Sequence, residues 1–305
     1  MTREQERRRP SLSEESLTLL DHAIKFARSV LTECERNRMH DAANVLVFAT
    51  LAKTLASARS ARALIIRRHY WDAKLIIRSM LDSLVDVMYI LHDPSQTRML
   101  LKLFRIEMAV DQWDWLSYAA RRQKTQPNQL SVRDPQLRTI ECEYRWAKRQ
   151  PEFHAKQGEW PKRWKYITQA EKIKAMGSSH RLWLDELHFS ITEMGNAAAH
   201  SRGLALQTFV RPGDTPGRVK FTTNTGLHLD LANRRQLIME PFVCVLVMSG
   251  VIIDSFQLGN HYERRLDALR KRWMSAVGKR SPQIERDSRR RTASTNRGLR
   301  LGGVT

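Results

Sequence analysis

The segment DAKLIIRSMLDSLVDVMYILHD, residues 72–93, decides the fold. At 100° per residue its polar side chains fall within one sector about 140° wide, and the rest of its circumference is apolar. The polar members are Arg78, Ser79, Asp82, Ser83 and Asp86. A helix that is apolar around most of its surface is buried on most sides, so we predict that this helix is central to a helical bundle.

Much of the remaining chain shows the same helical spacing of apolar residues. It predicts helices over residues 11–36, 41–68, 95–118, 134–149, 179–199 and 233–277. The strand-like stretch lies at 204–231, where alternating residues flank a PGDTPG turn and predict a small β-hairpin. The expected fold class is therefore an all-α helical bundle with a small inserted β-hairpin and a disordered basic C-terminal tail.

The chain is strongly basic, with 52 Lys and Arg against 32 Asp and Glu and a formal net charge of +20. Residues 121–174 and the segment from Lys271 onward each contribute +8. Such a segregated charge predicts appendages on one folded domain. We expect a basic arm at 1–10, a single helical domain at 11–278 with a basic insertion at 121–165 and the hairpin at 204–231, and a disordered basic tail at 279–305.

Several functional classes lack their signatures here. The three cysteines, Cys34, Cys142 and Cys244, are too far apart for a disulfide framework or a zinc motif. The apolar run Phe242–Ile253 is shorter than the twenty or so residues that a bilayer span needs, so it predicts a buried core helix. Phosphate-loop, dinucleotide and hydrolase motifs are also missing. We therefore expect a cytoplasmic protein with no cofactor, no metal and no membrane partner.

Two groups of residues are candidates for catalysis. Arg78 and Asp82 are four residues apart on the central helix, where they line a site or form an intrahelical ion pair. Asn196 and His200 are likewise one turn apart, beside three alanines that allow close packing. A partly desolvated His200 can act as acid or base near neutral pH, or it can tie down a helix C-terminus. Both alternatives stay open for each group.

The run A73-x-x-I76-I77-R78-S79-x-L81-D82 resembles the bacterial family called domain of unknown function 5677. A second block of that family has Trp, Gly, aromatic, Ser and His positions in order. Here they are matched by Trp164, Gly177, Trp183, Phe189, Ser190 and His200. The resemblance covers roughly residues 40–210 and implies a helical architecture without an activity to transfer. Asp82 stands where the family usually has Glu, and Trp183 where it often has Tyr.

A looser similarity is to the higher-eukaryote-and-prokaryote nucleotide-binding (HEPN-like) bundles, many of which are metal-independent RNases of toxin or defence systems. Their motif is Arg, a polar residue, three variable residues and His. The stretch from Asn196 to His200 is similar to its second half, but Gly195 replaces the arginine. Arg202 or Arg78 is the substitute cation that this similarity implies.

Basic charge is the remaining functional signal. It predicts contacts with the phosphates of RNA or DNA, and aromatic residues between the basic ones are candidates for stacking on bases. The candidate binding residues are Arg163, Trp164, Lys165, Arg289, Arg290 and Arg291. The alternative is a solubilising tail on a non-catalytic scaffold that forms homodimers or binds a protein partner.

Overall fold

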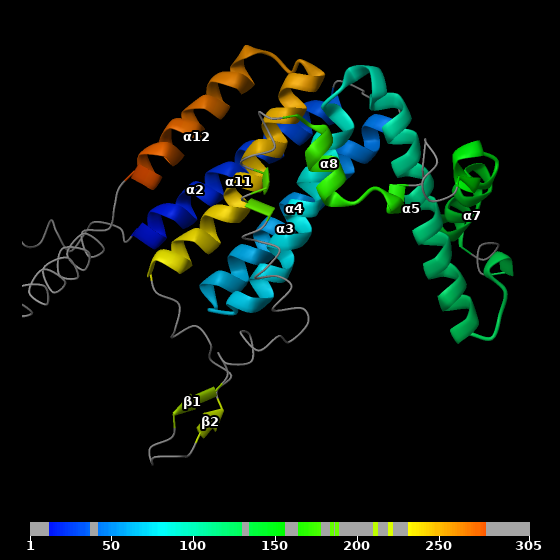
Figure 1. Cartoon of the computed structure of the whole chain (residues 1–305), viewed down its shortest axis with the longest axis horizontal. Helices are drawn as coiled ribbons and strands as arrows, with labels where there is room; N and C mark the ends of the chain where they lie inside the picture. The colour runs from blue at the N-terminus through cyan, green and yellow to red at the C-terminus, as the bar shows by residue number, and fades with distance from the viewer. Residues whose placement is uncertain are drawn as a thin grey trace, which may run out of the picture.

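Long helices packed side by side form the body of the protein in the computed structural model (Figure 1). The structure describes residues 12–36, 42–129, 134–155, 164–177, 184–185, 187–188, 210–212, 219–221 and 231–278. The long helices are α2 (Leu12–Arg36), α3 (Ala42–Ile66), α4 (Tyr70–Leu91), α5 (Pro94–Arg122), α11 (Leu231–Phe256) and α12 (Asn260–Gly278). Shorter elements are α7 (Pro135–Lys148), η1 (Pro151–His154), η2 (Trp164–Tyr166) and α8 (Gln169–Ala175).

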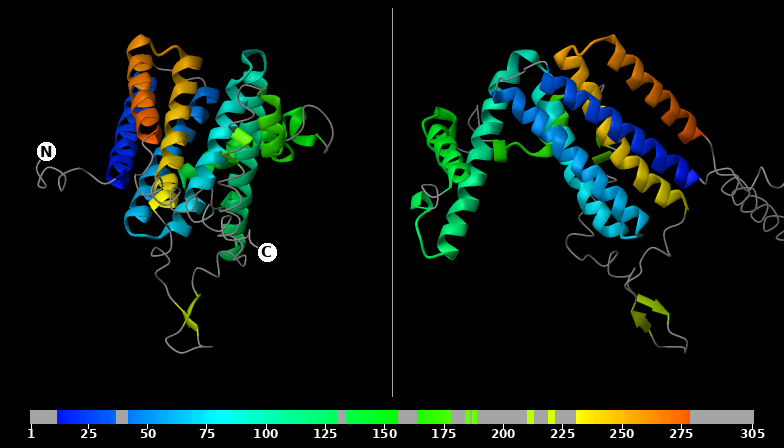
Figure 2. Two further views of the ribbon diagram at one scale, coloured as in Figure 1. Left: turned by 60° about the vertical axis from the view of Figure 1, so that its left-hand side comes forward. Right: turned by 180° about the vertical axis from the view of Figure 1, so that it is seen from behind.

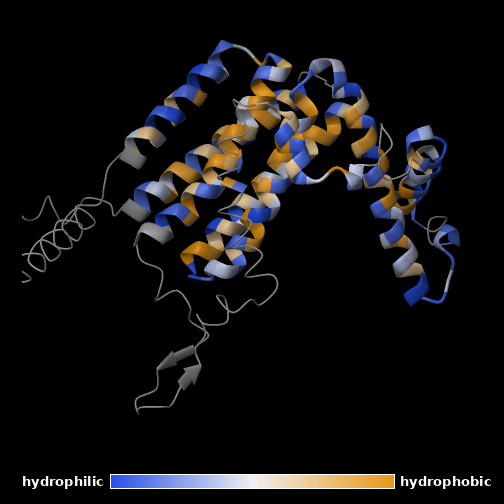
Figure 3. Ribbon diagram, viewed as in Figure 1, coloured by the Kyte–Doolittle hydropathy of each residue, from blue (hydrophilic) through white to orange (hydrophobic). Residues whose placement is uncertain are grey.

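Helix α4 lies at the centre of the body, as its apolar circumference predicts. It packs against α3, α11, α5 and α8, and α11 also packs against α2 and α3. The apolar residues of these helices form one continuous core, which includes Ile77, Leu81 and Leu84 of α4 and Phe242 of α11. In Figure 3 the apolar residues likewise gather where these helices face one another.

The apolar run Phe242–Ile253 lies within α11 and is largely buried, as expected of a core helix. By length and composition the stretch Arg235–Phe256 is apolar enough to cross a membrane. However, 78% of its apolar window is buried inside the protein, against the neighbouring helices. Packing in the bundle thus accounts for the hydrophobicity of α11.

Local chemistry sets the boundary between α4 and α5. Asp93 caps the N-terminus of α5, because its carboxylate accepts hydrogen bonds from the hydroxyl and the backbone N–H of Ser95 at 2.7 and 2.9 Å. These bonds hold the pKa of Asp93 below its usual value. Pro94 occupies the first turn of α5, where no intrahelical N–H donor is needed.

The prediction of one helix over 233–277 is wrong. The chain turns between α11 and α12, at Gln257 and Gly259, which have φ angles of 49° and 96°. This left-handed conformation ends a helix and is easiest for glycine. Helix α12 then folds back against α2 and α11 (Figure 2).

The inserted β-hairpin also needs correction, because the folded body is all-α. The strands β1 (Val210–Pro212) and β2 (Val219–Phe221) have three residues each and pair antiparallel, with Val210 opposite Phe221. Both lie away from the helices in all views (Figures 1 and 2). A two-stranded ribbon that packs on no hydrophobic layer is marginal, so it is not a structural component of the domain.

The basic insertion forms a helical side arm on α5. Helix α7 confirms the helix expected at 134–149, and it packs on α5 at one end of the molecule (Figure 2). Arg105 of α5 donates two hydrogen bonds of 2.9 Å to Glu143 of α7, and Lys102 pairs with Glu152 of η1 at 2.7 Å. A second small apolar cluster around Ile106 and Ala147 fills this contact.

Candidate functional site

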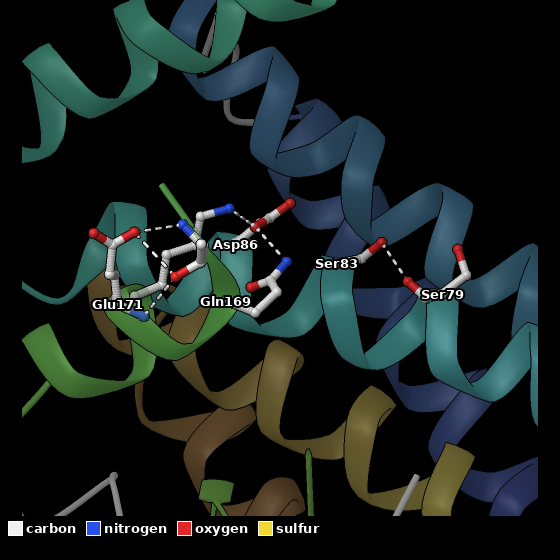
Figure 4. Close-up of polar contacts among 7 residues, drawn as sticks. Ser79, Ser83, Asp86, Gln169 and Glu171 are labelled. Atoms are coloured by element: carbon white, nitrogen blue, oxygen red, sulfur yellow. Dashed lines mark hydrogen bonds and ion pairs between the residues drawn. The ribbon is translucent and has the colours of Figure 1, made fainter. Parts of the chain in front are cut away.

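The polar sector of α4 faces α8, so that residues more than 80 positions apart meet (Figure 4). Asp86 accepts a hydrogen bond of 2.7 Å from Lys172 Nζ and one of 3.2 Å from Gln169 Nε2. On the same sector the Ser83 hydroxyl donates to the Ser79 carbonyl at 2.9 Å. The sector therefore has partners in the protein and is no bare solvent-exposed face.

Lys172 is a buried cation held from two sides. Its side chain is only 4% exposed, and its ammonium lies 4.2 Å from the ring centroid of Trp164 as well as beside Asp86. Trp164 in turn packs against Tyr89 and Phe104. A lysine away from water needs a counter-charge and further favourable contacts for its ammonium group. The Asp86 carboxylate supplies the counter-charge, and the Trp164 ring supplies a cation–π contact.

The sequence around α8 explains why Lys172 is positioned there. Thr168 and Glu171 form a capping box, with each side chain accepting a hydrogen bond from the backbone N–H of the other residue. Beyond the other end, Gly177 has a φ angle of 81°, which favours glycine whatever space a side chain would have. Both ends of this short helix are thus fixed by local sequence.

Asp82 is the residue in this region with the most distinctive electrostatics. Burial raises the pKa of its carboxyl above the usual value, and the neighbouring Arg78 guanidinium opposes that rise. Asp86 adds to the rise, whereas His188 and Lys172 favour the ionised form. A half-buried carboxyl among these groups can exchange protons nearer neutrality than an ordinary aspartate. We call Arg78, Asp82, Asp86, Lys172 and His188 the α4 cluster.

The structure places only some of the predicted catalytic residues. Arg78 and Asp82 lie together on α4, half-buried, whereas Asn196 and His200 lie outside the described residues. The expected meeting of Arg78 with His200 therefore stays a prediction. His188, which lies within the helix predicted over 179–199, interacts electrostatically with Asp82. Among the residues that the structure describes, no three His, Cys, Asp or Glu side chains gather as metal ligands.

The predicted nucleic-acid residues differ in their surroundings. Lys165 is exposed, and Arg163, Arg289, Arg290 and Arg291 lie outside the described part of the chain. Trp164 is only 6% exposed because it fills the core beside Lys172. Its ring is therefore occupied by internal contacts and is not available for a base in this conformation.

Two features of the structure were not predicted from the sequence. Trp115 and Tyr118 of α5 are 60% and 57% exposed, although the helical pattern places them on an ordinary helix. Their spacing of three residues was the available signal, since it puts both rings on one face. The other feature is a buried ion pair between Lys74 and Glu240, which lie on α4 and α11.

Comparison with known proteins identifies the region that contains the α4 cluster. The Family of unknown function (DUF5677) matches residues 44–216. The protein belongs to the DUF5677 family. No curated protein and no solved structure matches the chain, and the similarity to HEPN-like bundles is not shown by these comparisons.

The DUF5677 region contains α4, Trp164, α8 and Gly177. Of the second block that resembles the family, Trp164 and Gly177 lie in the described part of the chain. Trp164 packs on Lys172, which pairs with Asp86 of α4, and Gly177 has the positive φ of the turn after α8. Both residues therefore have structural roles.

Substitution of Asp82 tests whether its carboxylate costs stability. Because its pKa is raised in the folded state, ionised Asp82 destabilises the fold at pH 7 and this cost disappears as the pH falls through the raised pKa. We expect Asp82→Asn to raise the thermal midpoint at pH 7, with the difference vanishing below the unfolded pKa of 3.8. A lower midpoint at pH 7 would show that the ion pair with Arg78 outweighs burial. Melting curves between pH 3 and pH 8 measure this (about one scan per pH unit suffices).

Proposed function

We propose that this DUF5677 protein binds single-stranded nucleic acid through the C-terminal half of α5. The observation that carries the proposal is the exposure of Trp115 and Tyr118, at 60% and 57%. Two exposed aromatic side chains side by side on one helix face form an apolar patch, which is typical of an interaction surface, and every unpaired base offers a face on which they can stack. We call Trp115, Tyr118 and Arg122 the α5 face.

The α5 face follows from helical geometry. Residues three or four apart are neighbours on a helix surface, so Trp115, Tyr118 and Arg122 succeed one another along one side of α5. Arg121 and Lys124 are also exposed at the same end of the helix. A single strand can stack its bases on the exposed aromatic rings while its phosphates contact the neighbouring cations.

Two carboxylates limit the part of α5 that a nucleic-acid strand is expected to contact. Asp111 and Asp114 are exposed, and each lies four residues, about one turn, before one ring of the pair. Phosphates are repelled there and attracted at the opposite end, where α5 finishes with Arg121 and Arg122. We therefore infer that the strand crosses the C-terminal end of α5 and does not run along the whole helix.

Other aromatics of the side arm are engaged in packing. Tyr144 stacks on Trp113 with ring centroids 4.7 Å apart, and the Arg105 guanidinium lies 4.1 Å from the centroid of Trp146. These contacts hold α7 on α5 and thereby support the helix that presents the α5 face. These rings thus stabilise the arm, and the proposed contact with bases is made by Trp115 and Tyr118.

Salt dependence tests the contribution of the basic tail. Truncation after Gly278 removes eight Lys and Arg and two acidic residues. If those cations contact phosphates, truncation weakens binding of single-stranded RNA and flattens the log–log salt dependence by about 0.7 per lost contact. The thermal midpoint should stay unchanged. Equal affinity and equal slope with and without the tail would assign it a solubilising role.

A second candidate function is weak, metal-independent RNA cleavage. It is favoured by the raised pKa of Asp82 beside Arg78 and His188, in a region whose sequence continues to Asn196 and His200. In this proposal His200 takes the proton from a ribose 2′-hydroxyl, a step in which acid–base help contributes about 10² to 10⁴ in rate. In this proposal Arg78, which also faces Asp82, contributes the positive charge beside the phosphate.

The cleavage proposal has a direct assay. Wild type should cut a single-stranded RNA slowly in EDTA, and His200→Ala and Arg78→Ala should each lose that activity. Cleavage that survives His200→Ala, or none by wild type, contradicts it. Binding without cleavage leaves a nucleic-acid-binding protein, and neither binding nor cleavage favours a scaffold that pairs with itself or with a protein.

A further inference from the structure

We propose that a basic hollow between α2 and α3 is a binding site for a phosphate group. The hollow has a volume of about 330 Å³, at the lower end of the range for small-molecule sites. Its lining consists of Asp21, Ile24, Lys25, Arg28, Arg59 and Arg62. We call it the α2–α3 hollow, and it shares no residue with the α4 cluster or the α5 face.

Helical spacing brings these side chains to one place. Asp21, Lys25 and Arg28 lie on successive turns of α2, and Arg59 and Arg62 are three residues apart on α3, which packs against α2. Ile24 is only 6% exposed and contributes the apolar side of the hollow. The cations therefore lie at the rim of a packed helix–helix contact, against which the aliphatic parts of their side chains can pack.

One cation is held in a fixed orientation. Arg62 Nη2 donates a hydrogen bond of 2.7 Å to one carboxylate oxygen of Asp21, and Nε lies 2.6 Å from the other oxygen in an ion pair. These two contacts restrain the guanidinium while the side chain stays 33% exposed. Asp21 thus acts as a positioning residue that orders Arg62 at the hollow.

The other three cations of the hollow are Lys25, Arg28 and Arg59. These side chains form no ion pair with any residue that the structure describes. With Arg62 and Asp21 they give the hollow a formal charge of +3. Like charges gathered in a concave site repel one another, so an anion that enters relieves this repulsion and gains several charge-assisted hydrogen bonds.

Phosphate is the anion that fits this set of donors. Arginine forks match the paired oxygens of a phosphate, and a lysine adds a mobile point charge. A terminal phosphate of a small molecule and a backbone phosphate of RNA present the same oxygens. The inference does not depend on the α5 face, because α2 and α3 supply all of its residues.

Calorimetric titration of the full chain with pyrophosphate tests the site, with a ten-nucleotide single-stranded RNA as the second probe. Arg28→Gln and Arg59→Gln should each weaken binding by about tenfold or more, since each removes hydrogen bonds to a charged group. Lys53→Gln is the matched control. It removes the same charge from α3 but lies nine residues from Arg62, about half a turn around the helix.

The two probes separate the sources of the phosphate. Weaker pyrophosphate binding by Arg28→Gln and Arg59→Gln, but not by Lys53→Gln, supports a small phosphate ligand. A loss seen with RNA alone supports a backbone phosphate. If the hollow variants match Lys53→Gln with both probes, the site is refuted. Trp115 and Tyr118 are not part of the α2–α3 hollow. The pyrophosphate titration therefore tests the hollow even if the α5 face does not bind RNA.

Discussion

Replacement of Lys74 by methionine is expected to lower the free energy of unfolding by about 3–5 kcal/mol. The Lys74 ammonium lies 2.6 Å from both carboxylate oxygens of Glu240, and the two side chains are 10% and 4% exposed. Burial raises the pKa of Glu240, and Lys74 opposes that rise. Removing the lysine leaves a carboxylate in the core whose remaining hydrogen bond within the described part of the chain comes from Gln236 Nε2, at 3.4 Å.

A double variant distinguishes the loss of the ion pair from the loss of side-chain packing. Lys74→Met combined with Glu240→Leu removes both charges, and replacing a buried ion pair by apolar residues is often neutral or stabilising. We expect the double variant to regain most of the stability that Lys74→Met loses. Urea unfolding of wild type, both single variants and the double variant gives the coupling energy. A loss below about 1 kcal/mol in Lys74→Met would contradict the account of a desolvated pair.

The double variant Trp115→Ala/Tyr118→Ala is expected to weaken binding of single-stranded RNA by at least about fivefold for each ring. Base stacking on an aromatic side chain contributes about 1–3 kcal/mol by alanine substitution. Both residues are exposed, so the free energy of unfolding should change by less than about 0.5 kcal/mol each. Fluorescence anisotropy with a labelled RNA measures the affinity, and a melting curve verifies the fold.

Two further variants are controls for the effect of the double variant on RNA binding. Met274→Ala removes another exposed apolar side chain, 63% accessible on α12, and should leave RNA binding unchanged. Trp113→Ala removes the ring that stacks on Tyr144, so it should loosen the side arm and lower the thermal midpoint. If Met274→Ala weakens binding as much as the double variant does, the effect is unspecific and the α5 face has no special role.

Periodicity was sufficient to predict the central helix and the side-arm helix. The apolar circumference of 72–93 reports burial directly, and the spacing within 134–149 gave α7 nearly to the residue. The break at Gln257–Gly259 was missed because the apolar pattern runs into both flanking helices. A lone Gly259 was the available signal, and turn chemistry outweighed periodicity there.

Long-range polar pairs could not be found in the same way. Asp86 meets Lys172 across 86 positions, and Lys74 meets Glu240 across 166. Helical spacing predicts which residues of one helix are neighbours within a few turns. It does not predict which residue of another helix packs against them. For the same reason Trp164 was assigned to a nucleic-acid surface, although the fold places it beside Lys172 in the core. The exposure of Trp115 likewise depends on where α7 packs.

Recognition of unpaired bases by the α5 face is tested most directly by the ratio of the affinities for a single-stranded RNA and for the duplex of the same sequence, measured at one salt concentration. We expect wild type to bind the single strand more tightly by about tenfold or more, and Trp115→Ala/Tyr118→Ala to lose this preference. Equal affinities of wild type for the single strand and the duplex would contradict it.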